Sequence, residues 1–181
     1  MITGTPATIE DLYHVPGKAE IVNGEIVLMS PTGAAPSYAA SEIFVSLREY
    51  SRRNKKGYAV NDNAAFRVKL PNRESFSPEA AFYIGKWTGM RFFEGAPLFA
   101  VEVRSEGDYG PAMEKLLVAK RADYFAAGTL IVWDVDLLSD EVIKSYSANN
   151  PGKPTNFRRG EIANAEPALP GWSIAVDDLF P

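Results

Sequence analysis

The chain contains no cysteine and a single histidine, His14. The absence of cysteine excludes disulfides and thiolate metal sites. One histidine excludes zinc sites built from several histidines and argues against a serine hydrolase. Any metal bound here must therefore be held by oxygen atoms, which favours Mg²⁺ or Mn²⁺. We expect His14 to lie at the surface and assign it no function.

Long hydrophobic runs and an excess of positive charge are also missing. No apolar run is long enough to span a membrane and no signal-peptide pattern opens the chain, so we expect a cytoplasmic protein. The net charge of −4 argues against a protein whose main task is to coat nucleic acid, although a local basic groove remains compatible with it. The length of 181 residues and the ordinary globular composition predict one domain, residues 1–181.

The pattern of apolar residues predicts an α/β fold with a mixed sheet. Thr8 is a candidate cap for a short helix, and residues 18–30 are typical of a β-hairpin that turns at Asn23-Gly24. We expect a helix over residues 37–56 and an amphipathic helix over residues 112–127, the second ending before Gly128. Strands are expected over residues 58–63, 64–70, 79–84, 98–105, 129–136 and 141–147, with the last two antiparallel, followed by short strands and a final helical turn.

Three glutamates stand in or beside these apolar strands. Glu102 lies inside the apolar segment 98–105, Glu79 opens the strand before it, and Glu20 opens the hairpin. A buried carboxylate is costly unless a cation compensates it, and two converging carboxylates need one more strongly. One answer is a divalent metal held by Glu79, Glu102 and the backbone carbonyl of Val103, because hard oxygen ligands suit Mg²⁺. The alternative for Glu79 is a strand-edge residue paired with Lys69 or Arg73.

Two cations compete for a place beside such a metal. Arg104 follows Glu102 by two residues and shares its strand face, whereas Lys120 lies in the next helix with Tyr124 one turn further on. Lysine can exchange a proton with water and arginine cannot. We therefore favour Lys120 for positioning or activating water and Arg104 for clamping a phosphate or a carboxylate. Glu20 is expected as a second ligand, as the partner of Lys120, or as a solvated hairpin residue.

Six segments follow one another in a characteristic order: EIVNGEIV, SPTG, SPEAAFY, VEVRS, KRADYFAAG and VWDVD. Together they resemble the Uma-type restriction endonuclease family of the PD-(D/E)XK nuclease superfamily, over about residues 8–145. The resemblance implies a restriction-endonuclease-like core, in which helices flank a mixed central sheet, and a magnesium-dependent site that cleaves DNA phosphodiester bonds. It also implies that Glu20, Glu79, Glu102, Lys120 and Tyr124 occupy the family's functional positions.

The sequence departs from that family at two places. Glu79 replaces the usual aspartate, and the added methylene displaces the carboxylate by about 1.5 Å. A misplacement of about 1 Å can cost about a hundredfold in rate. Many members also carry a histidine soon after Pro-Thr-Gly, where this chain reads AAPSY and has none.

These observations favour a magnesium-dependent DNA endonuclease. The alternative is a catalytically weakened module of the same fold that binds DNA or a protein. A third possibility is a purely structural interaction domain that uses apolar residues of the C-terminal tail, Leu179 and Phe180. We also expect a homodimer for a nuclease, because cutting both DNA strands requires two sites.

Overall fold

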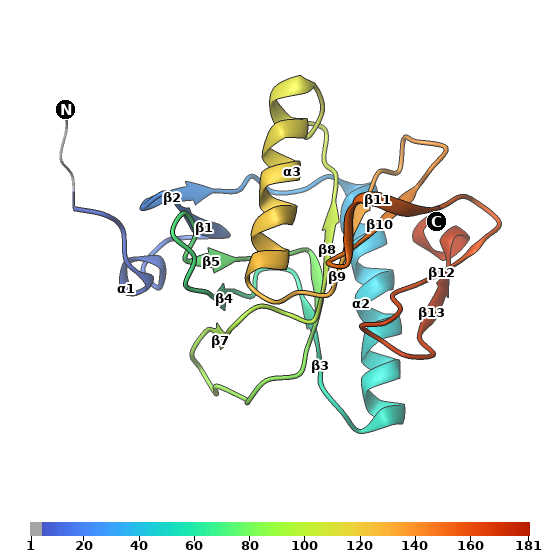
Figure 1. The fold of residues 1–181 in the computed structure, drawn as a ribbon, viewed down its shortest axis with the longest axis horizontal. Helices are drawn as coiled ribbons and strands as arrows, with labels where there is room; N and C mark the ends of the chain where they lie inside the picture. Colours follow the sequence, from blue (N-terminus) through green and yellow to red (C-terminus); the bar gives the residue numbers. More distant parts are fainter. Residues whose placement is uncertain (1–4) are drawn as a thin grey trace.

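The computed structural model describes residues 5–181, in which helices pack on both faces of a mixed sheet (Figure 1). The helical elements are α1 (Ile9–Leu12), α2 (Ala34–Asn54), α3 (Pro111–Ala126) and the final 3-10 turn η1 (Val176–Leu179). The strands are β1 (Ala19–Val22), β2 (Glu25–Leu28), β3 (Tyr58–Asn61), β4 (Phe66–Arg67), β5 (Ser75–Phe76), β6 (Ala80–Tyr83), β7 (Phe93–Glu94), β8 (Phe99–Val103), β9 (Ile131–Val135), β10 (Ile143–Ser147), β11 (Asn150–Phe157), β12 (Ile162–Asn164) and β13 (Ser173–Ala175).

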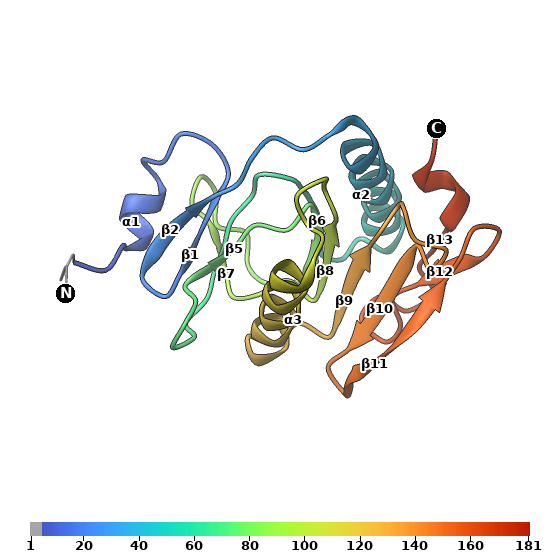
Figure 2. The ribbon, with the colours of Figure 1, turned by 90° about the horizontal axis from the view of Figure 1, so that it is seen from above.

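The central sheet has six strands in the order β11-β10-β9-β8-β6-β3. Strands β8 and β9 run parallel, and the other neighbouring pairs run antiparallel. A parallel pair needs a crossover connection, and α3 supplies it. Helix α3 lies on one face of the sheet and α2 covers the other (Figure 2). The predicted mixed α/β fold is confirmed.

The N-terminal hairpin forms as predicted and lies beside the short strand β5. The turn residues Asn23 and Gly24 have φ values of 52° and 75°, the left-handed conformation that a two-residue hairpin loop requires. The hairpin is joined to the segment that leads into β5, because the Glu74 N–H donates to the Ile21 carbonyl at 3.1 Å. This contact brings Glu20, in β1, toward the sheet.

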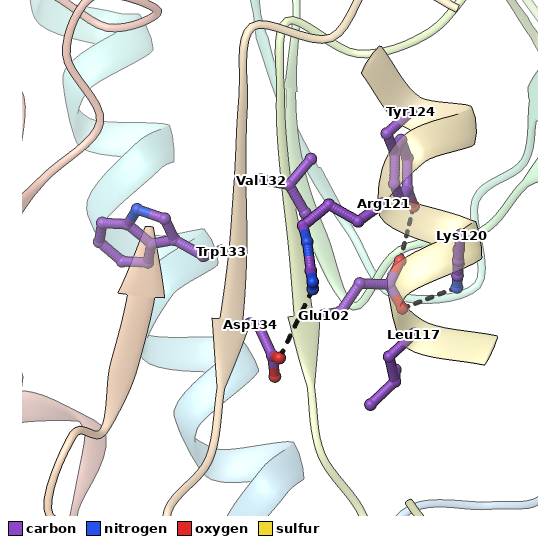
Figure 3. Close-up of a pocket in the computed structure, with 8 residues that line it drawn as sticks. All are labelled: Glu102, Leu117, Lys120, Arg121, Tyr124, Val132, Trp133 and Asp134. Carbon is purple, nitrogen blue, oxygen red and sulfur yellow. Dashed lines mark hydrogen bonds and ion pairs between the residues drawn. The ribbon is translucent and has the colours of Figure 1, made fainter. Parts of the chain in front are cut away.

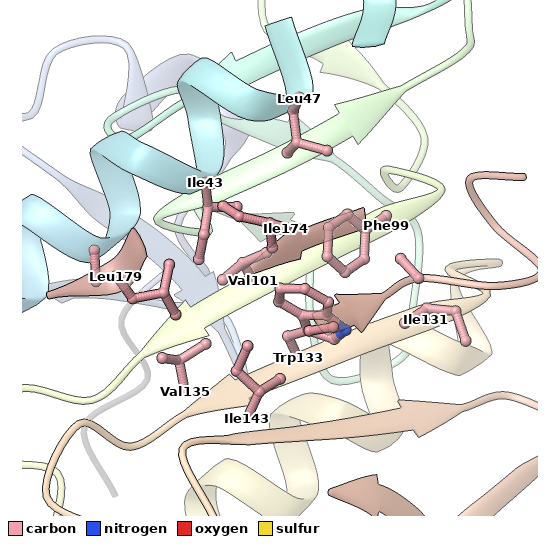
Figure 4. Packing of buried hydrophobic residues seen from close by; sticks show 14 of the residues in the cluster. Ile43, Leu47, Phe99, Val101, Ile131, Trp133, Val135, Ile143, Ile174 and Leu179 are labelled. Carbon is pink, nitrogen blue, oxygen red and sulfur yellow. The ribbon is translucent and has the colours of Figure 1, made fainter. Parts of the chain in front are cut away.

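Strand β8 is buried on both of its faces. Phe99, Val101 and Val103 belong to the core beneath α2. Phe99 and Val101 lie beside Trp133 of β9 there (Figure 4). Ala100 belongs to the smaller core on the α3 side. Because side chains alternate along a strand, the carboxylate of β8 is directed to the same side as Ala100. The α2 side of the sheet is thus apolar, and charge collects beneath α3.

Helix α3 is confirmed close to its expected bounds, but its packing differs from an ordinary amphipathic helix. Tyr124 is its fully buried residue, while Leu116 and Val118 are 60% and 54% exposed. The helix is therefore held to the sheet largely through polar contacts, which are described below. Strands β5 and β7 are not predicted by the sequence, because two residues are too few to show a period. Among residues 5–181, no helix combines the length and apolarity needed to cross a bilayer.

Candidate active site

Glu102 projects from β8 toward α3 and meets two side chains of that helix (Figure 3). The Lys120 ammonium donates to Glu102 Oε2 at 2.7 Å, and the Tyr124 hydroxyl donates to Glu102 Oε1 at 2.6 Å. Lys120 and Tyr124 are four residues apart and therefore lie one helical turn apart on one face. Burial and the neighbouring negative charges of Glu102 and Glu20 hold the pKa of Tyr124 well above its ordinary value, so the phenol stays a donor.

Lys120 also reaches the hairpin. Its ammonium lies 3.0 Å from Glu20 Oε1 and so joins a carboxylate of β1 to one of β8. Burial favours the neutral amine, but the charges of Glu102 and Glu20 outweigh it and raise the pKa of Lys120. The side chain therefore stays an ammonium at neutral pH. That state suits the orientation of water and the stabilisation of negative charge better than the removal of a proton.

Glu20 has further partners beside Lys120. Arg73 donates to its Oε2 at 2.6 Å and the Ser77 N–H donates to its Oε1 at 2.8 Å. Burial opposes its ionisation, but the positive charges of Lys120 and Arg73, together with the Ser77 N–H, lower the pKa of Glu20. Of the roles expected for Glu20, its position beside Lys120 matches that of the ion-pair partner.

Arg73 is a site residue whose actual partners the sequence does not reveal. Its guanidinium donates to Asp123 of α3 at 2.8 Å as well as to Glu20, and it lies 4.9 Å from the ring centroid of Phe76. The preceding Asn72 also donates to Asp123, at 2.9 Å. Arg73 therefore ties the hairpin and the loop before β5 to the helix that carries Lys120.

Glu79 stands at the entrance to β6 and is held from two sides. Its Oε2 accepts the Val103 N–H at 3.1 Å, and its Oε1 accepts the Lys18 ammonium at 2.7 Å. Lys18 also contacts Asp62 Oδ1 at 2.6 Å. The pairing that the sequence suggested for Glu79, with Lys69 or Arg73, is not the one formed. Lys18 takes that place, and nothing in its local sequence marks it.

Nearby positive charge compensates the buried carboxylate of Glu102 less completely than that of Glu20. Burial is the main reason, and the negative charges of Glu79 and Glu20 add to it. Lys120 opposes these effects without cancelling them, and the pKa of Glu102 rises from 4.5 to about 7. The ionised form of Glu102 would therefore gain from one more positive charge close by.

Arg104 lies on the same strand face but takes a different set of partners. It donates two hydrogen bonds to Asp134 of β9, at 2.7 and 2.8 Å, and two to Glu114 of α3, one of them at 3.2 Å. Asp134 is also 3.8 Å from Arg121, whose guanidinium stacks 3.6 Å from the Tyr146 ring centroid. Arg104 was expected to clamp a phosphate or a carboxylate, and in the structure its partners are carboxylates. This network anchors the first half of α3 beside the site.

The oxygen atoms of the cluster fit a hard divalent cation. Glu79 accepts a hydrogen bond from the N–H of Val103, the residue after Glu102. The negative charge of Glu79 is close enough to Glu102 to raise the pKa of the Glu102 carboxyl. Across residues 5–181, no group of three or more Asp, Glu, His or Cys side chains is arranged to hold a metal. Mg²⁺ commonly uses one or two carboxylates and keeps its other positions for water and phosphate, so a pair of glutamates suffices.

The fold thus brings Glu20, Glu102, Lys120 and Tyr124 into one hydrogen-bonded cluster, with Glu79 beside it. His14 is exposed, as expected. The sequence did not predict the contacts made by three further charged residues of the neighbourhood, Lys18, Arg73 and Asp134. Asp134 carried a usable signal, since it is a carboxylate inside the apolar strand IVWDV, as Glu102 is inside FAVEV.

Comparison with known proteins agrees with this architecture. A family model, Uma2, described as "Putative restriction endonuclease", matches residues 7–177. No curated protein matches the chain. A crystal structure at 1.96 Å resolution of a protein from Anabaena variabilis, described as a putative nuclease of DUF820, is similar with a TM-score of 0.74. The two share 16% identity over 97% of this chain and 98% of the other, a likeness that shows the fold alone.

Proposed function

Because the chain belongs to the Uma2 family of putative restriction endonucleases, we propose that it hydrolyses phosphodiester bonds of DNA with the aid of Mg²⁺ or Mn²⁺. The observation that carries the proposal is the position of the Lys120 ammonium. It lies 2.7 Å from Glu102 and 3.0 Å from Glu20, two carboxylates that come from different sheets. A charged lysine beside an undercompensated buried carboxylate is the arrangement expected at a site that handles phosphate and a cation.

The cation would be held by carboxylate oxygens of Glu79 and Glu102 and by the Val103 carbonyl. When bound, it supplies Lewis-acid polarisation of the phosphate and a more acidic water. The chain's own residues fix the ligands: the Val103 N–H holds Glu79, and the Tyr124 hydroxyl holds Glu102. Such hydrogen bonds orient ligand oxygens and restrict their motion.

Lys120 provides the remaining positive charge of the site. Its raised pKa keeps it protonated, so it would orient the attacking water and stabilise negative charge that develops on the phosphate. Glu20 keeps the ammonium in place from the hairpin side, and Arg73 in turn keeps Glu20 ionised. Arg104 is occupied by carboxylates, and we assign it a supporting role under α3.

The test is cleavage of supercoiled plasmid by the purified protein with Mg²⁺, with Mn²⁺, and with EDTA. We expect metal-dependent cleavage that falls by about 10²-fold or more in Glu102→Gln and Lys120→Met, because each removes a group acting on the transition state. Lys115→Met is the matched control: it removes an exposed lysine from the same helix and should leave the rate unchanged. Equal activity in the wild type and in both site variants would refute the proposal.

The second candidate function is a binding module with a weakened site. It is favoured by one observation: the Glu79 carboxylate, which replaces the family's aspartate, is engaged by Lys18 at 2.7 Å. For this candidate, calorimetry would show no binding of Mg²⁺ to a protein that is folded by circular dichroism. Retention of DNA fragments, weakening steeply with salt, would then separate a DNA-binding module from a protein-binding or purely structural one.

A homodimer would offer one site to each DNA strand. Light scattering over a range of protein concentrations checks it, and a monomer at the concentrations that cleave both strands would exclude it.

A further inference from the structure

Lys18 lies between two carboxylates at the end of a strand ladder. Asn61 of β3 pairs with Ala80 of β6. Asp62 follows β3 and Glu79 precedes β6, so the two residues lie opposite each other just beyond the paired part of these antiparallel strands. The Lys18 ammonium is 2.6 Å from Asp62 and 2.7 Å from Glu79. The Lys18 side chain is only 13% exposed, whereas that of Asp62 is 47% exposed.

Building on the function proposed above, we propose that Lys18 is a placeholder cation. It neutralises Glu79 while no metal is bound, and it shifts entirely to Asp62 when a divalent cation binds. Lys18 is then a positioning residue that sets the affinity of the site for metal, and Asp62 is the group that receives it.

The two oxygens of Glu79 lead to this inference. Oε2 is held by the Val103 N–H at 3.1 Å, so its direction is set by β8. Oε1 is the oxygen that Lys18 occupies, at 2.7 Å. An ammonium and a divalent cation at one partly buried carboxylate repel each other strongly, because low polarity around the pair reduces screening. A divalent cation at Oε1 therefore competes with Lys18 and favours its withdrawal from Glu79.

Asp62 lowers the free-energy cost of moving Lys18 away from Glu79. A buried ammonium that loses its only partner is strongly destabilised. Lys18 already contacts a second carboxylate, which lies closer to solvent, and so leaves Glu79 without becoming unpaired. Lys120 has a comparable second partner in Glu20, but that partner is itself buried and shared with Arg73. Lys18 is therefore the cation better placed to move.

The experiment is calorimetric titration with Mn²⁺ alone, without DNA, of the wild type, Lys18→Met, Lys18→Arg and Asp62→Asn. We expect Lys18→Met to bind Mn²⁺ about tenfold more tightly, because the metal no longer has to displace the charge-assisted hydrogen bond between Lys18 and Glu79. Lys18→Arg keeps the charge and should not gain affinity. Asp62→Asn should bind several times more weakly, because Lys18 loses its second partner. The same substitution in a Lys18→Met background should have a smaller effect.

The control is Lys69→Met, which removes an exposed lysine from the segment after β4. Its affinity should equal that of the wild type. Mn²⁺ binding by the wild type, with unchanged or weaker binding by a folded Lys18→Met, would overturn the placeholder role and leave the proposed nuclease function intact. Absence of binding in the wild type and in every variant would overturn both. If Lys18→Met does not fold, an affinity of Asp62→Asn equal to or above that of the wild type overturns the inference.

Discussion

Arg73 offers the sharpest test of how the site is held together. It is 6% exposed, and its guanidinium reaches Glu20 at 2.6 Å and Asp123 at 2.8 Å. Arg73→Met removes the charge and keeps much of the apolar stem. Removal of one partner from a buried ion pair typically costs about 3–5 kcal/mol. Because Lys120 remains beside Glu20, we expect the lower end, about 3 kcal/mol.

The measurement is urea unfolding followed by tryptophan fluorescence, with Arg73→Met, Glu20→Gln and the double variant compared. The double variant should cost at least about 1 kcal/mol less than the two single changes together, because with glutamine at position 20 the loss of Arg73 no longer leaves a buried carboxylate there without it. Arg91→Met is the matched control. That arginine pairs with Glu10 at 2.9 Å, but both side chains are exposed, so a loss below about 1 kcal/mol is expected.

The reasoning would be refuted if Arg73→Met lost no more stability than Arg91→Met. It would also be refuted by strict additivity in the double variant, since that would mean that Arg73 and Glu20 do not stabilise each other. Either result would mean that Arg73 does not link α3 to the hairpin through Glu20.

Three further predictions concern other parts of the molecule. In EDTA, the free energy of unfolding should fall as pH rises from about 5 to 7, because folded Glu102, with a pKa of about 7, keeps its proton where the unfolded residue, with 4.5, has lost it. Urea titrations at pH 5 and pH 8 should differ by up to about 3 kcal/mol from this residue, and a Glu102→Gln variant with the same difference would contradict the assignment. Tyr124→Phe removes a hydrogen bond to Glu102, so plasmid cleavage should slow by about tenfold without loss of the fold, and an unchanged rate would exclude an orienting role. Leu47→Ala, in the core beneath α2, should cost about 2–5 kcal/mol in thermal or urea unfolding while sparing cleavage at 25 °C, and a loss below about 1 kcal/mol would contradict the packing.

Much of the fold could be predicted from local sequence patterns. The helices α2 and α3, the hairpin turn at Asn23-Gly24 and the main strands follow from periods and turn residues that any short window of sequence displays. Strands β5 and β7 did not follow, because two residues carry no period and their pairing depends on distant segments. The exposed apolar side of α3 was also unexpected, since a helix pattern does not say which neighbours are present.

The carboxylates of the site could be predicted for a different reason. A glutamate inside an apolar strand conflicts with its surroundings, and that conflict can be read locally for Glu102. Asp134 shows the same conflict in β9, yet its role became clear only through the register that places it beside Glu102. A conflict in the sequence shows that a charge needs a partner but not which partner it has.

The sequence by itself determined the main strands, the helices and the acidic side chains that require compensation, because propensity and the cost of desolvation belong to a residue and its near neighbours. Only the tertiary structure decided which cation each carboxylate receives. Arg73 reaches Glu20 across 53 residues and Lys18 reaches Glu79 across 61, and neither lysine nor arginine carries a local mark of its partner. Ion pairing depends on distance through space, and that distance exists only once the hairpin, the sheet and α3 have packed together.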